Sequence, residues 1–187
     1  MTKPANEVER IKALKRYEIL DTPPDGTFDK ITSLASRIFN MPIAIVSLVD
    51  EDRIWFKAQY GLDGVEQIDR APGLCASAIL SDDIYLVEDA INDPRTLANP
   101  LVCGEFGLRF YAAAPLKTHD GYNLGTLCVI DKRQRYLSRE QEGILKDLAD
   151  IVMDEIEIRL AARNAIFQSN QRIAELEGAI SRLQVEN

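Results

Sequence analysis

The chain of 187 residues carries a formal net charge of -8, and 46% of its residues are apolar. This length fits one domain with an appendage, and the composition excludes wholesale disorder. The acidic balance and the lack of a basic run argue against a nucleic-acid partner or an anionic membrane surface. Because no apolar run could span a bilayer and the N-terminus is charged, unlike a signal peptide, we expect a cytoplasmic protein with no membrane partner.

Cysteine and histidine usage limits the chemistry. Cys75, Cys103 and Cys128 are odd in number and widely spaced, which favours reduced thiols over a disulfide framework. His119 is the only histidine in the sequence. A histidine-based metal site, or a Cys-His catalytic pair between sequence neighbours, therefore has no donors, and we predict neither a metal site nor catalytic residues.

Two helices are predicted at the start of the chain. Apolar residues from Val8 to Leu20 recur at helical spacing, and a Pro-Pro-Asp-Gly break at 23–26 ends this segment. A second helix is predicted over 27–39. Its buried face is expected to hold Phe28, Ile31, Leu34, Ala35 and Ile38.

Two hairpins are predicted farther along the chain. The β-branched run at 42–49 and its return at 54–60 form the first, followed by a loop over 61–70. The second joins the runs 108–116 and 122–130 through an Asp-Gly turn and is expected at the centre of an antiparallel sheet. Its small residues leave room for a packed helix or a small molecule; they are Ala112, Ala113, Ala114, Gly125 and Thr126.

The crossover between the hairpins combines short elements with long loops. A helix of small residues is predicted over 72–80 and a short strand over 84–87, and turn signals with helical pieces fill 88–107. Long, loop-rich segments often carry ligand contacts, so we expect part of a binding site in this crossover.

One long helix is predicted from Ser138 to the end of the chain, because Ser138 to Gln141 form a capping box and no proline follows. Its first half is expected to bury Ile144, Leu145, Leu148, Ile151 and Val152 on the sheet. Farther on, an apolar heptad seam predicts a parallel coiled-coil homodimer, with a solvated single helix as the alternative. The seam consists of Ile166, Ile173, Leu176, Ile180 and Leu183.

The order of these elements and four stretches of sequence resemble a GAF domain, of the subgroup at the N-terminus of bacterial and cyanobacterial sensor histidine kinases and diguanylate cyclases. The stretches are RIKALKRYEILDTPPDGTFDKIT, PIAIVSLVDEDRIWFKAQYGL, DPRTLANPLVCGEFGLRFYAAAPL and LGTLCVIDKRQRYLSREQ. The resemblance implies an α+β fold with helices flanking a six-stranded or similar antiparallel sheet, and a pocket closed by segments between Gly61 and Gly107. It further implies a sensory domain over 1–160 and a coiled-coil signalling helix over 161–187, truncated before an output kinase or cyclase domain.

The function that the resemblance implies is that of a non-enzymatic sensory and dimerisation module for a small ligand of unknown identity. Trp55 and Phe110 would supply stacking surface and Ser77 a hydrogen bond, although Trp55 also has a purely structural alternative. Ser77 stands where the subgroup often has a histidine, which removes the obvious donor to haem or a metal. The positions that the resembled fold places at the pocket are Trp55, Phe56, Cys75, Ser77, Phe110, Ala112 and Cys128.

Other functions stay open. A thiol-based reductase like free methionine sulfoxide reductase would use the cysteines, although Cys75 has no basic neighbour in sequence and the catalytic motifs of that family are not visible. A bilin photoreceptor would attach its chromophore to Cys103, although Gly104 follows where a histidine is usual. A relay with an empty pocket would only dimerise, or would dock a basic partner on its acidic surface.

Overall fold

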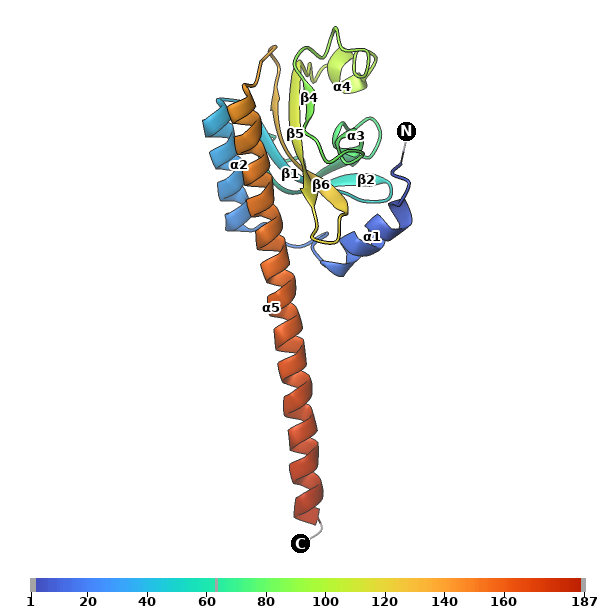
Figure 1. Ribbon diagram of the computed structural model, residues 1–187, viewed down its shortest axis with the longest axis vertical. Helices are drawn as coiled ribbons and strands as arrows, with labels where there is room; N and C mark the ends of the chain where they lie inside the picture. The colour runs from blue at the N-terminus through green and yellow to red at the C-terminus, as the bar shows by residue number, and fades with distance from the viewer. Residues whose placement is uncertain (1–2, 63, 186–187) are drawn as a thin grey trace. The chain divides into compact units, whose positions relative to one another are not determined.

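The computed structural model describes residues 3–62 and 64–185, with side chains up to residue 182 (Figure 1). The chain forms two compact units, Met1–Met153 and Asp154–Asn187, and the boundary falls inside one long helix, α5 (Arg139–Val185). The first unit contains the sheet and the shorter helices. The second unit is the remainder of α5.

The first unit is built on a six-stranded antiparallel sheet with the strand order β3-β2-β1-β6-β5-β4. Both predicted hairpins are present, and β1 pairs with β6 to join them at the centre, with Ile45 opposite Cys128. The predicted α+β fold is therefore confirmed. The strands are β1 (Ile43–Val49), β2 (Arg53–Tyr60), β3 (Gln67–Asp69), β4 (Tyr85–Val87), β5 (Phe110–Lys117) and β6 (Asn123–Asp131).

The edge strand β3 corrects the predicted loop over 61–70. Its Ile68 pairs with Ile54 of β2, so the sheet extends one strand beyond the first hairpin. A strand of three residues with a single apolar side chain is too short to show an alternating pattern in the sequence.

The first two helices begin and end where their local chemistry allows. α1 (Glu7–Arg16) ends earlier than predicted, because the backbone turns into the left-handed region at Glu18, with φ 46°. α2 (Gly26–Phe39) begins where the Asp25 carboxylate accepts a hydrogen bond from a backbone amide in the first turn. No helix in the described part of the chain has the length and apolar content needed to cross a membrane.

Longer helices cover one face of the sheet. α2 contacts β1 and β2, and in Figure 1 α2 and the first turns of α5 lie on the side opposite α3 and α4. The apolar stripes of α2 and α5 are wider than the faces that these helices bury. The prediction of burial is therefore wrong for Leu34, Ile38 and Ile151, whose exposed fractions are 38%, 41% and 52%. Ile144 is half-buried. The prediction is confirmed for Phe28, Ile31, Ala35, Leu145, Leu148 and Val152, which are buried.

Short elements cover the other face. α3 (Cys75–Ala78) contacts β1, β5 and β6, and α4 (Pro100–Cys103) lies in the crossover before β5. They pack with their connecting segments over an apolar cluster that includes Ile45, Tyr111 and Cys128. Short segments do not fill space as regularly as a long helix, and a cavity lies among them.

Gly125 serves the sheet itself rather than a ligand or a helix. A Cβ atom at this position would lie 1.9 Å from the backbone oxygen of Ser47 in β1. The absence of a side chain therefore allows β1 and β6 to pair closely. The expectation that Gly125 leaves room for a helix or a small molecule is corrected by this contact.

Candidate functional site

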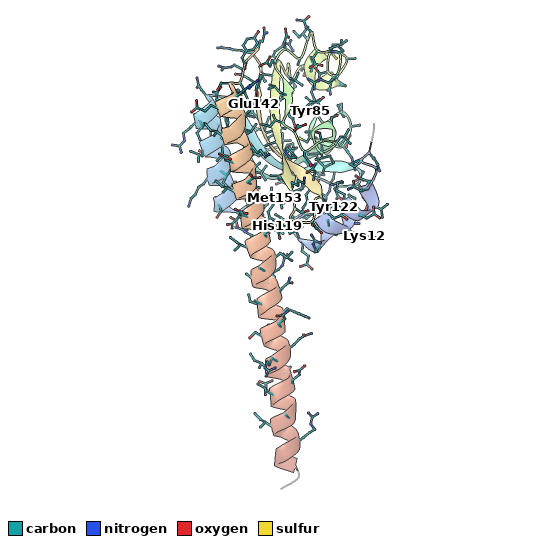
Figure 2. All side chains as sticks on the ribbon, in the orientation of Figure 1. Lys12, Tyr85, His119, Tyr122, Glu142 and Met153 are labelled. Atoms are coloured by element: carbon teal, nitrogen blue, oxygen red, sulfur yellow. The ribbon has the colours of Figure 1, made fainter. Side chains whose placement is uncertain are left out.

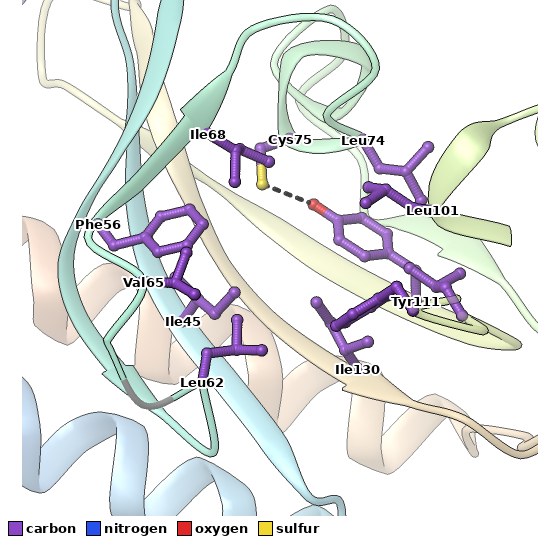
Figure 3. A pocket seen from close by; sticks show the side chains of 12 residues that line it. Ile45, Phe56, Leu62, Val65, Ile68, Leu74, Cys75, Leu101, Tyr111 and Ile130 are labelled. Atoms are coloured by element: carbon purple, nitrogen blue, oxygen red, sulfur yellow. Dashed lines mark hydrogen bonds between the residues drawn. The ribbon is translucent and has the colours of Figure 1, made fainter. Parts of the chain in front are cut away.

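The candidate site is a cavity of about 200 Å³ between the sheet and the segments that cover it (Figure 3). Four strands supply its floor through Ile45, Phe56, Tyr111 and Ile130. The crossover side of the fold supplies the rest of the wall, as the resemblance implies for the segments between Gly61 and Gly107. These residues are Leu62, Val65, Ile68, Leu74, Cys75, Leu101, Phe106 and Leu108.

Strand alternation decides which side chains reach the cavity. Successive side chains of a strand point to opposite faces, so Tyr111 lines the cavity while Phe110 and Ala112 face away from it. In β2 the same alternation brings Phe56 to the cavity and turns Trp55 to the other face.

The structure brings only part of the predicted set of seven residues to the cavity. Phe56 and Cys75 line it, and Cys128 is buried in the same apolar cluster without lining the cavity. Ser77, on α3, is half-buried and also lies outside the lining. Trp55 lines a separate surface groove together with Pro23, Pro24 and Lys57.

Most of the lining was missed because its residues look like ordinary core in the sequence. The sequence carries a signal for Tyr111, because this residue lies between the predicted Phe110 and Ala112 and strand side chains alternate between the two faces. All three side chains are buried, so hydrophobicity alone does not tell which of them faces the cavity.

The lining carries almost no polar atoms. Twelve of the described side chains line the cavity; ten of them are hydrocarbon, and Cys75 and Tyr111 carry a sulfur and an oxygen atom. These two groups satisfy each other, because the Tyr111 hydroxyl donates a hydrogen bond to Cys75 Sγ across 3.2 Å (Figure 3). Burying an unpaired hydroxyl or amide in such surroundings costs roughly 2–7 kcal/mol. The hydrogen bond to Cys75 Sγ therefore avoids this cost for the Tyr111 hydroxyl.

The Cys75 thiol is the chemically distinctive group of the cavity. A hydrogen bond with Cys128 lowers the pKa of Cys75 below its usual value, against the opposing effect of burial, and hydrogen bonds from Ser47, Tyr111 and Thr126 lower it further. The interaction with Cys75 and burial together raise the pKa of Cys128. The neighbours that activate Cys75 come from β1, β5 and β6, so its neighbours in sequence do not reveal them.

The remaining candidates for cofactor chemistry lie apart from the cavity lining. Cys103 is exposed on α4, and His119 lies in the turn between β5 and β6 (Figure 2). Within residues 3–62 and 64–185, no three His, Cys, Asp or Glu side chains gather in a way that could hold a metal ion. The chemistry of the site is therefore that of its apolar wall and its Cys75–Tyr111 pair.

Comparison with known proteins assigns the fold to a family. A family model described as GAF domain matches residues 23–156, which is most of the chain. The chain belongs to the GAF family. This GAF domain is 38% identical over 184 residues to the cyclic di-GMP phosphodiesterase PA2567 of Pseudomonas aeruginosa. The match covers 98% of the chain but 30% of that relative, so the chain spans less than a third of the relative's length.

Solved structures show the same fold at low sequence identity. The GAF domain of an Acinetobacter phosphoenolpyruvate-protein phosphotransferase matches with a TM-score of 0.60 at 19% identity, covering 83% of this chain and 98% of the other. A free methionine-R-sulfoxide reductase from Neisseria meningitidis, in complex with its substrate, matches with a TM-score of 0.61 at 17% identity. The match covers 87% of this chain and 96% of the reductase chain. A domain of a two-component sensor histidine kinase protein from Sinorhizobium meliloti matches with a TM-score of 0.56 at 17% identity. The match covers 75% of this chain and 94% of that domain's chain.

Proposed function

We propose that this GAF domain is a non-enzymatic sensory and dimerisation module, in which a small molecule in the cavity controls the state of α5. The observation that carries the proposal is the short path from the cavity wall to the start of that helix. Ile130 lines the cavity at the end of β6, and α5 begins at Arg139. A displacement of the wall therefore has only a short connection to cross.

Hydrogen bonds stiffen this connection at both ends. Asp131, next to Ile130, accepts a hydrogen bond from the Arg135 guanidinium across 2.6 Å and another from a backbone amide in the connection. At the start of α5, the Ser138 hydroxyl accepts from the backbone amide of Gln141 at 3.2 Å, and the Gln141 side chain accepts from the Ser138 amide at 3.0 Å. A connection held in this way transmits a shift instead of absorbing it.

The proposed output of the second unit is a parallel coiled-coil homodimer. Ile166, Ile173, Leu176 and Ile180 are between 51% and 62% exposed along α5 in the single chain. A row of large apolar side chains at heptad spacing is stabilised when a second helix covers it. The side chain of Leu183, the last predicted seam residue, lies outside the described residues.

The proposed mechanism is a shift between two arrangements of the dimer. A ligand changes their populations only if it binds the cavity more tightly in one arrangement than in the other. The similarity to part of a larger protein named as a cyclic di-GMP phosphodiesterase supports the proposal that this domain regulates an attached output domain. We propose a signalling enzyme in that place, such as a kinase or a cyclase.

The second candidate function is that of a thiol-based reductase similar to free methionine sulfoxide reductase. The lowered pKa of Cys75 favours it. The thiolate would be the attacking nucleophile, with Cys128 as the thiol that resolves the intermediate. Methionine sulfoxide, the purified protein and a thiol reductant test this directly. Turnover that Cys75→Ser abolishes would establish that the domain is a reductase and refute a non-enzymatic role.

Native mass spectrometry of the freshly purified protein tests the sensory proposal. We expect a dimer in which each cavity can carry a small mass that is released on denaturation. Ile173→Asp combined with Ile180→Asp should give a monomer with a folded sheet domain, because charges on the seam lose their solvation in the dimer. Gln171→Asp with Ser181→Asp, which adds the same charges off the seam, should remain a dimer. A dimeric seam variant would refute the coiled coil.

A further inference from the structure

We infer that the cavity selects a compact, uncharged, hydrocarbon-rich molecule of about the size of a substituted single ring. This inference rests on the proposed function only in treating the cavity as the sensory site, and it names the chemical class of ligand. Three features of the cavity carry it: its volume, the composition of its wall and the exposure of its outer side chains.

The volume sets the size of the ligand. The cavity measures about 200 Å³. An engineered cavity of about 150 Å³ with a similar wall of Leu, Ile and Phe side chains stays dry and binds benzene. A benzene ring with one or two small substituents therefore fits this cavity. A nucleotide, with its base, sugar and phosphate, is larger than the space available.

The wall excludes charge. A phosphate or carboxylate needs an N–H donor or a basic side chain, and none of the described residues that line the cavity is Lys, Arg, His, Asn, Gln, Ser or Thr. The Tyr111 hydroxyl already donates to Cys75 Sγ. Lys132 lies over the ring of Phe106 at 5.2 Å from its centroid, but it is exposed and not part of the lining. A charged ligand would lose its hydration in the cavity and find no partner there.

The outer wall allows entry. Leu62, Val65, Ile68, Leu101 and Phe106 are half-buried, whereas the side chains of the floor are buried. They come from β3 and from the loops and short helix of the crossover side, so they can move apart without breaking a pair of central strands. A small apolar molecule can therefore reach the floor from this side.

The test uses three ligands, of which one is uncharged and two are charged, and two variants that differ in position. Toluene, benzoate and cyclic GMP are titrated into the full chain with ¹³C-labelled Ile, Leu and Val methyl groups, and the methyl NMR shifts are followed. Leu101→Phe narrows the cavity from its half-buried rim. Leu97→Phe adds the same ring in the same crossover at a residue that is 50% exposed and outside the lining, so it is the matched control.

Toluene should shift the methyl signals of Ile45, Val65 and Ile130, and benzoate should bind at least about tenfold more weakly. Leu101→Phe should weaken toluene binding by at least about tenfold, and Leu97→Phe should leave it unchanged. Binding of benzoate or cyclic GMP at these methyls, without binding of toluene, would overturn the ligand class and leave the sensory proposal standing. If none of the three ligands shifts them, the ligand class is refuted, and the ligand mass and dimer in native mass spectrometry decide the sensory proposal separately.

Discussion

The cluster of Glu7, Arg10 and Arg70 and the lining of the cavity bury polar groups in opposite ways. In the cluster, the Glu7 carboxylate accepts hydrogen bonds from Arg10 at 2.8 and 3.0 Å and also contacts Arg70, and both arginine side chains are almost fully buried. Two positive charges thus share one negative charge. In the cavity, a hydrogen bond and not an ion pair joins the two polar side chains, Tyr111 and Cys75.

The difference shows where this domain uses its buried charges. Arg70 follows β3 and also donates to the backbone oxygen of Asp50 in the β1–β2 turn at 2.8 Å, so the cluster connects α1 to that edge of the sheet. Among the described residues, no Asp, Glu, Lys, Arg or His lines the cavity. A charged cluster therefore fastens α1 to the edge of the sheet, whereas the described wall of the cavity offers shape and apolar contact.

The largest effect is expected from breaking the charged cluster. Glu7→Gln removes the anion and leaves Arg10 and Arg70 without a counter-charge, which should lower the free energy of unfolding by about 3–5 kcal/mol. Urea denaturation followed by circular dichroism measures the change. Glu9→Gln, an exposed carboxylate on the same helix, should stay within about 0.5 kcal/mol of the parent chain. Equal effects of the two substitutions would contradict the role of the cluster.

The stability that Glu7 contributes through this cluster should decrease as the pH falls. Burial alone would raise the pKa of Glu7, but hydrogen bonds and the charges of Arg10 and Arg70 lower it from 4.5 to about 2. A carboxylate with a lowered pKa in the folded state contributes its full stability above the unfolded value and loses it as the pH falls through the folded value. The stability difference between the parent chain and Glu7→Gln should therefore shrink between about pH 4.5 and pH 2. A difference that is constant over this range would be inconsistent with the ion pair.

A smaller effect is expected in the cavity. Tyr111→Phe removes the hydrogen bond to Cys75 while keeping the ring, and should cost about 0.5–1.5 kcal/mol. The pKa of the Cys75 thiol should rise, since this hydrogen bond lowers it. Alkylation by iodoacetamide across pH, in a Cys103→Ser background that removes the exposed thiol, follows that change. Tyr60→Phe, at an exposed ring, is the control, and an unchanged profile in Tyr111→Phe would show that the hydrogen bond does not act on the thiol.

Periodicity predicted the elements but not the orientation of the buried strands. The runs that form β1, β2, β5 and β6 and the capping box of α5 were readable, because each depends on residues close together in sequence. Phe110 and Ala112 were selected for the pocket in place of Tyr111, because β5 is buried on both faces and its pattern shows two faces without distinguishing them.

Contacts between residues far apart in the sequence could not be predicted either. Glu7 and Arg70 meet because α1 docks beside the end of β3. The sequence pattern predicts a loop, and not a strand, at β3. The partners of Cys75 likewise come from strands that only the folded sheet brings together. Such contacts follow from the packing of elements and not from any local pattern.

If the cavity and the dimer are coupled, a ligand in the cavity must change the dimer dissociation constant. Sedimentation equilibrium measures it for the full chain with and without saturating toluene. We predict a change of at least about threefold, because a ligand that favours one arrangement must shift the association equilibrium. Leu101→Phe should abolish that change. An identical dissociation constant in both conditions, with toluene bound in the cavity, would show that the cavity and the dimer are not coupled.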